Sequence, residues 1–147
     1  MEKRGQMNLS FGMIFSIILI IIFLAFGFYA ITKFLELQDS IQVEQFLSDV
    51  QDDVNTMWKS PQGSREVGYS LPSKIDSVCF FDYDEFENLK FTSERIISGG
   101  KINNIDIESI SDRGNPLCIE NIGGKVKMII SKNYGEMLIT IGRKNEI

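Results

Sequence analysis

The apolar residues of this 147-residue chain are concentrated near its N-terminus. No charged residue occurs from Gly5 to Thr32, and most positions there are Ile, Leu, Phe, Met or Ala. As a helix, residues 9–32 would rise about 36 Å, which is enough to cross a hydrocarbon core of about 30 Å. A cleaved secretory signal is the alternative, but its apolar core is shorter, about 7 to 15 residues, and a small-x-small site follows it. The pattern therefore favours a retained transmembrane helix over residues 6–32, preceded by a short basic flank of residues 1–5.

The charges on either side of this segment predict its orientation. Lys3 and Arg4 lie just before the apolar run, whereas Lys33 alone follows it before the acidic Glu36 and Asp39. Basic flanks are retained in the cytoplasm. We therefore expect a single-pass membrane protein whose N-terminus is cytoplasmic and whose C-terminal domain is extracytoplasmic.

Apolar residues continue at helical spacing beyond the membrane segment. These positions are Phe34, Leu37, Ile41, Phe46, Leu47, Val50, Val54, Met57 and Trp58. Polar residues between them indicate a solvated opposite face, and Pro61 ends the pattern. We expect an amphipathic helix over residues 33–60 that packs on the following domain. A compatible alternative is that part of its apolar stripe also packs against other copies or a partner.

Residues 61–147 have the composition and alternation of short β-strands. Expected strands cover 67–71, 75–83, 117–122, 125–131 and 136–142, with edge strands at 91–97 and 105–110. Gly123-Gly124 indicates a hairpin turn, and Gly99-Gly100 is interpreted as another turn. We expect the last three strands to form a meander. The predicted fold class is α+β, with a long N-terminal helix followed by a small antiparallel β-sheet head.

Composition excludes several classes of function. The chain has no His, which excludes Ser-His-Asp and Cys-His catalytic sites and any zinc site with a His ligand. A net charge of -5 argues against a nucleic-acid partner. The acidic cluster Asp82, Asp84, Glu85 and Glu87 offers oxygen ligands for Ca²⁺, but it lacks the EF-hand pattern and is interpreted as a solvated loop. We expect no enzyme activity, no cofactor and no metal site.

The two cysteines, Cys79 and Cys118, lie in two of the expected strands. An extracytoplasmic compartment permits a disulfide between them, and such a link would stabilise a small domain by at most about 4 kcal/mol. The alternative is a pair of buried free thiols.

The residues at the start of the apolar run carry a resemblance to a known family. Lys3-Arg4-Gly5-Gln6 resembles the processing site of archaeal type IV pilin-like proteins with a class III signal peptide. The resemblance implies that a prepilin peptidase-like enzyme cuts between Gly5 and Gln6 on the cytoplasmic side. Family members commonly have Glu four residues after this Gln, whereas this chain has Ser10, which favours a minor or initiating subunit.

The resemblance also implies a role for each part of the chain. The apolar helix would anchor and assemble a surface filament, and the β head would serve adhesion or partner contact. Its partners would be membrane lipid, the processing enzyme, and other pilin-like subunits or a membrane complex. The small residues Gly12, Ser16, Ala25 and Gly27 are positions where neighbouring helices could approach closely. The alternative function is a non-polymerising single-pass membrane protein with an extracytoplasmic interaction domain.

Overall fold

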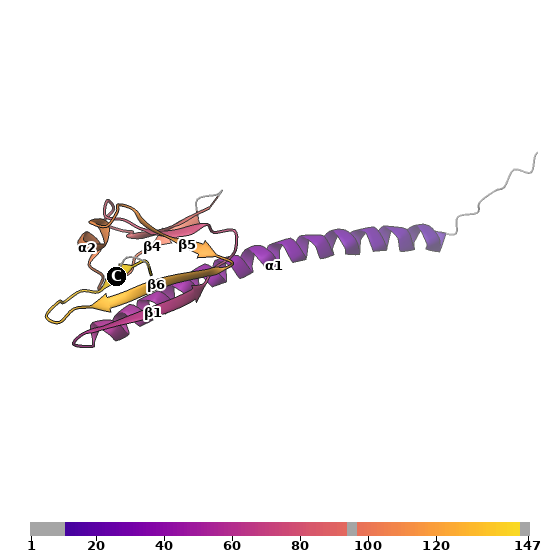
Figure 1. Cartoon of the computed structure of the whole chain (residues 1–147). Coiled ribbons are helices and arrows are strands. Elements are labelled where there is room, and N and C mark those ends of the chain that lie inside the picture. Colours follow the sequence, from indigo (N-terminus) through magenta and orange to yellow (C-terminus); the bar gives the residue numbers. More distant parts are fainter. Residues whose placement is uncertain (1–10, 94–96, 145–147) are drawn as a thin grey trace, which may run out of the picture. The chain divides into compact units, whose positions relative to one another are not determined.

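The structure is a computed structural model that describes residues 11–93 and 97–144. It consists of one long helix followed by a small antiparallel sheet, so the predicted α+β fold is confirmed (Figure 1). The chain divides into two compact units, residues 1–38 and 39–147. The predicted processing residues Gly5 and Gln6, together with Ser10, lie outside the described residues.

Helix α1 (Phe11–Trp58) begins in the first unit and continues into the second. Its large apolar side chains in the first unit are exposed; Ile20 is 58% and Phe23 is 69% exposed. The uncharged part from Phe11 to Thr32 rises about 33 Å, compared with about 30 Å for a hydrocarbon core. By length and composition, α1 is sufficient to cross a membrane.

The second unit contains seven strands and one short helix among its described residues. The strands are β1 (Gly63–Ser70), β2 (Ser77–Phe80), β3 (Leu89–Thr92), β4 (Ile97–Gly100), β5 (Leu117–Ile122), β6 (Lys125–Lys132) and β7 (Thr140–Gly142). All of them pair antiparallel in the order β1-β6-β5-β2-β3-β4, with β7 also on β6. Strand β5 pairs with β2 through its first four residues and with β6 through its last two, so it joins the two halves of the sheet.

The predicted meander of the last three strands is wrong in its arrangement, although both of its hairpins form. Strand β1 pairs with β6 over eight residues and occupies one edge of that strand completely. Strands β5 and β7 therefore share the other edge of β6, where they pair with residues 125–126 and 129–131 respectively. A meander would need β5 and β7 on opposite edges, and the long pairing with β1 prevents this.

Two further predictions between β3 and β5 are also wrong. Gly99-Gly100 is part of β4 rather than a turn, because β4 approaches β3 too closely for a side chain: a Cβ on Gly99 would lie 2.2 Å from the Leu89 carbonyl oxygen. The expected strand at 105–110 is instead mostly the short helix α2 (Ile107–Ser111). The Asp106 carboxylate accepts a hydrogen bond from the Ser109 backbone N–H at 3.0 Å, and this cap starts the helix.

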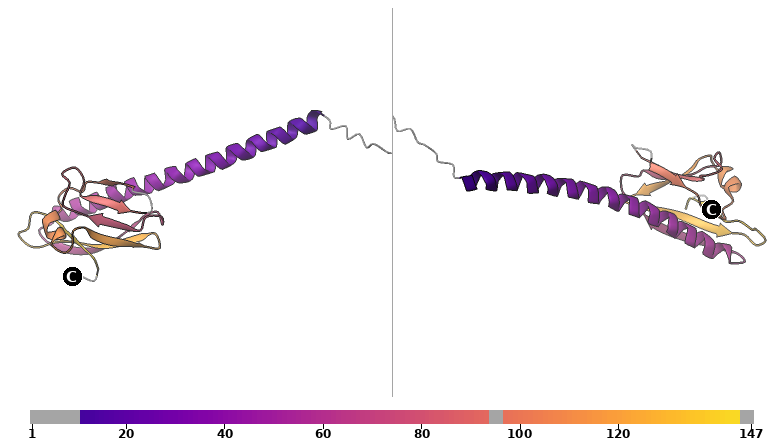
Figure 2. Two further views of the ribbon diagram at one scale, coloured as in Figure 1. Left: turned by 90° about the horizontal axis from the view of Figure 1, so that it is seen from above. Right: turned by 180° about the vertical axis from the view of Figure 1, so that it is seen from behind.

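The outer part of α1 supplies one wall of the core of the second unit. Phe46, Val50 and Val54 are fully buried and belong to the same apolar cluster as the inward side chains of the sheet. Phe46 contacts Tyr69 of β1 and Phe91 of β3 edge-to-face, with ring centroids 5.4 and 5.6 Å away. Viewed from behind, this part of α1 runs across β1 and β6 (Figure 2). The prediction that the amphipathic helix packs on the following domain is therefore confirmed.

The buried stripe of this helix is shorter than the apolar pattern predicted. Val43, Leu47 and Met57 are only partly buried against the core. Ile41 and Trp58 remain 53% and 43% exposed, although they have the correct spacing. The helix face therefore buries fewer apolar residues than it carries, because the sheet covers only part of it.

Candidate functional site

The outward face of the sheet is defined by the alternation of residues in β6. Val126, Met128 and Ile130 point into the core that α1 closes, and all three are fully buried. Lys125 and Lys127 alternate with them and are exposed. Successive side chains in a strand point to opposite faces, so these lysines lie on the face of the sheet that turns away from α1.

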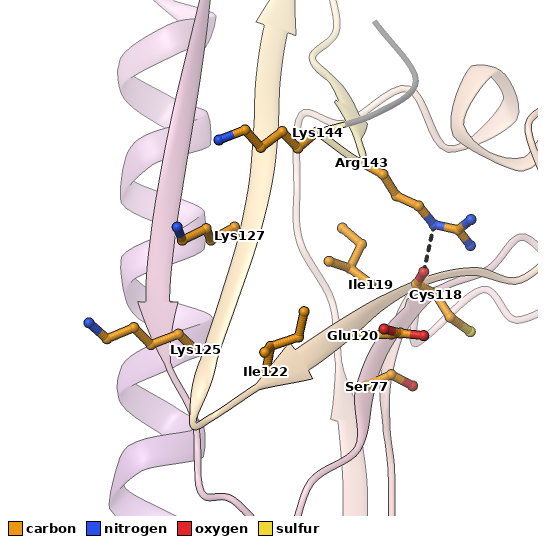
Figure 3. A pocket seen from close by; sticks show the side chains of 9 residues that line it. All are labelled: Ser77, Cys118, Ile119, Glu120, Ile122, Lys125, Lys127, Arg143 and Lys144. Atoms are coloured by element: carbon orange, nitrogen blue, oxygen red, sulfur yellow. Dashed lines mark hydrogen bonds between the residues drawn. The ribbon is translucent and has the colours of Figure 1, made fainter.

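An open groove with a volume of about 810 Å³ lies on this outward face. We call it the basic groove (Figure 3); it is lined by Ser77, Cys118, Ile119, Glu120, Ile122, Lys125, Lys127, Arg143 and Lys144. Four of these residues are cationic and one is acidic. In a chain with a net charge of -5, the groove is thus a local concentration of positive charge.

The four cationic side chains of the basic groove differ in the contacts that they make within the protein. The Lys144 ammonium lies 3.1 Å from the Glu66 carboxylate in a solvent-exposed ion pair. The Arg143 Nε donates a hydrogen bond to the Cys118 carbonyl oxygen at 2.8 Å, which places this side chain at the end of the groove. Lys125 and Lys127 make no ion pair with any residue in 11–93 or 97–144. Their charges are therefore available to an anionic partner.

A disulfide between Cys79 and Cys118 lies beside the groove. The two residues are directly opposite each other on β2 and β5, with their Cα atoms 4.0 Å apart. Their neighbours Val78 and Ile119 point into the core, so the disulfide is on the outward face. The Thr92 hydroxyl lies 3.4 Å from the Cys79 sulfur and helps to cover it. Of the two alternatives for the cysteines, the structure has the disulfide.

An acidic surface lies on the opposite side of the second unit. From Asp39 to Trp58, α1 carries five acidic residues and no basic residue. Two of them are paired with the head: Asp39 with Lys74, and Asp53 with Arg65. The other three are exposed and have no ion pair among the described residues; we call them the acidic helix face, which consists of Glu44, Asp49 and Asp52.

Asp53 also anchors α1 to β1 through a tyrosine. The Tyr69 hydroxyl donates a hydrogen bond to the Asp53 carboxylate at 2.7 Å. Burial of Tyr69, followed by this hydrogen bond and the negative charge of Asp53, raises the pKa of its hydroxyl well above the usual 10.0. The hydroxyl therefore stays protonated in the folded protein and holds the helix on the sheet.

The predicted helix-packing residues do not all share one face of α1. The Ser16 hydroxyl donates a hydrogen bond to the Gly12 carbonyl oxygen at 2.8 Å, so these residues lie one turn apart on the same side. At about 100° per residue, Gly27 lies roughly 60° around the helix from Gly12, whereas Ala25 lies about 140° away on the other side. A Cβ on Gly27 would meet no atom within 4 Å, which leaves this position open to a neighbouring helix.

The acidic cluster between β2 and β3 takes part in loop structure. The Asp84 carboxylate accepts a hydrogen bond from the Phe86 backbone N–H at 2.8 Å. The Glu85 carbonyl oxygen accepts one from the Lys101 ammonium, also at 2.8 Å. Within residues 11–93 and 97–144, no group of three or more His, Cys, Asp or Glu residues is placed to hold a metal ion.

Sequence reasoning did not identify the basic groove. The alternation of Lys125 and Lys127 with apolar residues was a usable signal, because it predicts two cations on one strand face. The contribution of Arg143 and Lys144 had no sequence signal. They reach the groove because β7 shares an edge of β6 with β5, and this arrangement exists only in the folded sheet. Comparison with family models, curated proteins and solved structures finds no match to this chain.

Proposed function

We propose that this protein is a membrane-anchored type IV pilin-like subunit, acting as a minor or initiating component of a surface filament. The apolar part of α1 anchors the subunit and packs in the assembly, and the β head provides adhesion or partner contact. The proposed role is structural, and no residue is assigned a catalytic function.

The observation that supports this proposal most directly is the exposed apolar surface of α1. Large side chains such as Ile20, Phe23 and Phe28 are more than half exposed in a helix that is long enough to span a membrane. An apolar helix surface of this extent requires lipid or other helices to cover it. The small antiparallel sheet that follows supplies the second part of the pilin-like layout.

The proposed orientation places the head outside the membrane and the N-terminus in the cytoplasm. The basic residues Lys3 and Arg4 favour this direction. The disulfide between Cys79 and Cys118 adds support, because disulfides persist mainly in extracytoplasmic compartments. Both observations are independent of the resemblance to a family.

The proposed processing step removes the basic leader at Gly5-Gln6. A new amino terminus at Gln6 would then enter the apolar interior of an assembly. Burying a charged amine without a carboxylate partner is costly, and Ser10 supplies no such partner. This cost supports a subunit that is used rarely, such as a minor or initiating one, over a subunit that is stacked many times.

Mass spectrometry of the N-terminus tests the proposal in a host with an active prepilin peptidase. We expect a mature chain that begins at Gln6. Replacing Gly5 by Leu should leave the leader attached, whereas the matched substitution Gly12→Leu, within the apolar run, should not affect cleavage. An intact leader on the unaltered chain would contradict the pilin-like proposal and favour a non-polymerising single-pass membrane protein. Protease treatment of intact cells tests orientation, since only an extracytoplasmic head would be digested.

A further inference from the structure

We propose that the basic groove of one copy of this protein binds the acidic helix face of a second copy. The two surfaces have opposite charge and occur once each on the same chain. The inference rests on the proposed function in one respect, namely that copies are confined to one membrane with their heads on the same side. It goes beyond that function by identifying which surfaces meet.

The two surfaces cannot meet within one molecule. Val126 and Met128 pack in the core with Val50 of α1, so α1 lies on one side of the sheet. Lys125 and Lys127 alternate with those residues and point to the other side, in front of the strands that separate them from the helix (Figure 3). An acidic helix face that is to reach a basic groove must therefore come from another chain.

Two unpaired charges on each surface have similar spacing. Lys125 and Lys127 are two residues apart on one strand face, so their Cβ atoms are about 7 Å apart. Asp49 and Asp52 are three residues apart on the helix, with Cβ atoms about 5 to 6 Å apart. Long lysine side chains readily span this small difference. Two ion pairs can thus form together, using only charges that have no ion pair among the described residues.

Apolar contacts are available beside both charged surfaces. Ile122 is 75% exposed next to the lysines of the groove. Ile41 is exposed one turn before Glu44 on the helix. Ion pairs between exposed groups contribute little by themselves, so an adjoining apolar contact that excludes water would strengthen them.

The kind of contact predicts the kind of assembly. The groove and the helix face are different surfaces, so the contact is heterologous rather than two-fold symmetric. Each copy that binds through its groove leaves its helix face free, and each that binds through its helix face leaves its groove free. A series of copies linked in this way is short when the protein is a minor or initiating subunit, as proposed above. We favour a second copy over another acidic partner because every copy carries both surfaces. The two surfaces are therefore always present at equal concentration on the same side of the membrane.

A charge-exchange experiment on the full-length protein in density-matched detergent tests this contact. Sedimentation equilibrium would compare the unaltered chain with Lys125→Glu/Lys127→Glu, with Asp49→Lys/Asp52→Lys, and with all four substitutions together. We expect each pair of substitutions to weaken self-association at least about tenfold, because like charges then face each other. The four substitutions together should restore association to within about threefold. Lys90→Glu/Lys101→Glu is the control, since it makes the same change in net charge on β3 and just after β4, at residues that do not line the groove.

Cross-linking of the unaltered chain supplies a test that does not depend on how a variant folds. A mixture of unlabelled and ¹⁵N-labelled protein would be treated with a zero-length carbodiimide. We expect mixed-isotope links between Lys125 or Lys127 and Glu44, Asp49 or Asp52. These links should weaken as salt increases, because the Debye length falls from about 10 Å at 0.1 M to about 3 Å at 1 M.

Several results would overturn the inference. The inference is wrong if the unaltered chain does not self-associate, or if neither charge reversal changes its self-association. It is also wrong if Lys90→Glu/Lys101→Glu reduces self-association by the same amount. Failure of the four-residue exchange to restore association, in variants that melt like the unaltered chain, would also overturn it. Binding of soluble polyglutamate to the groove without self-association would assign the groove to a different acidic partner. None of these results bears on processing at Gln6, so the inference can fail while the proposed function stands.

Discussion

The Tyr69 hydroxyl donates a hydrogen bond to the Asp53 carboxylate at 2.7 Å and so joins β1 to the outer part of α1. Asp53 also pairs with Arg65, which lies four residues before Tyr69 on the same face of β1. Tyr69 is only 7% exposed and packs edge-to-face on Phe46. Asp53, Arg65 and the Tyr69 hydroxyl therefore form a polar contact beside the buried aromatic pair. This contact sets the position of α1 on the sheet.

Removing either partner should destabilise the second unit. We expect Tyr69→Phe to lower the free energy of unfolding by about 1.5 to 3 kcal/mol, the usual range for a hydrogen bond to a charged group. Asp53→Ala should cost at least as much, because it also removes the partner of Arg65. Urea denaturation of the two single variants and the double variant gives the coupling between them. Strict additivity would show that the hydrogen bond does not contribute.

The raised pKa of Tyr69 predicts a loss of stability at alkaline pH. Below pH 10, the hydroxyl is protonated in both folded and unfolded chains, and its contribution is fully present. Above pH 10, the unfolded chain loses this proton while the folded chain keeps it, so stability falls as pH rises towards the folded pKa. The decline should be shallower in Tyr69→Phe. Melting temperatures measured from pH 8 to pH 11 would check this, and equal slopes for both proteins would contradict it.

The disulfide should stabilise the second unit without being needed for its strand pairing. Cys79 and Cys118 are 39 residues apart in sequence, for which the chain-entropy model gives at most about 4 kcal/mol. We expect Cys79→Ala/Cys118→Ala to unfold at lower urea concentration but to retain its β-sheet circular dichroism. Reductant should lower the stability of the unaltered chain and not that of the variant. Two thiols that alkylate freely in the native, non-reduced protein would contradict the disulfide.

Phe46 should be the most sensitive position on the outer part of α1. It is 1% exposed and contacts aromatic rings in both halves of the sheet. We expect Phe46→Ala to cost about 3 to 5 kcal/mol, through lost burial and the cavity that remains. Ile41→Ala is the matched control, because Ile41 belongs to the same predicted stripe but is exposed, and it should cost less than about 1 kcal/mol. Thermal melts of the two variants would distinguish them, and similar losses would contradict the observed docking.

Gly99 should not tolerate even one added carbon. A Cβ at this position would lie 2.2 Å from the Leu89 carbonyl oxygen, so β4 would have to separate from β3. We expect Gly99→Ala to destabilise the sheet by about 1 to 3 kcal/mol. Gly27→Ala, where a Cβ meets no atom within 4 Å, should leave the stability of the second unit unchanged. Hydrogen exchange at the amides of β3 would show whether the loss is local to this edge.

The periodicity of apolar residues was sufficient to predict most elements of the fold. The uncharged run after Gly5 and the helical spacing through Val54 predicted one long helix. This worked because the spacing of apolar residues depends on the local backbone conformation and on which face is buried. The alternation in residues 125–131 and the turn at Gly123-Gly124 predicted the hairpin of β5 and β6 for the same reason. The helix at 107–111 was missed because the apolar and polar residues of 105–108 alternate, which is the pattern of a strand.

Local pattern alone determined where the helix runs, which side chains alternate across each strand and how the chain can be held in a membrane. Only the tertiary structure decided that β1 occupies the free edge of β6, that Arg143 and Lys144 come to lie beside Lys125 and Lys127, and that Cys79 faces Cys118. These relationships join residues far apart in sequence, and strand order depends on competition for hydrogen-bonding edges across the whole sheet. That competition has no signature in any short stretch of sequence, which is why the basic groove could be seen only once the sheet was assembled.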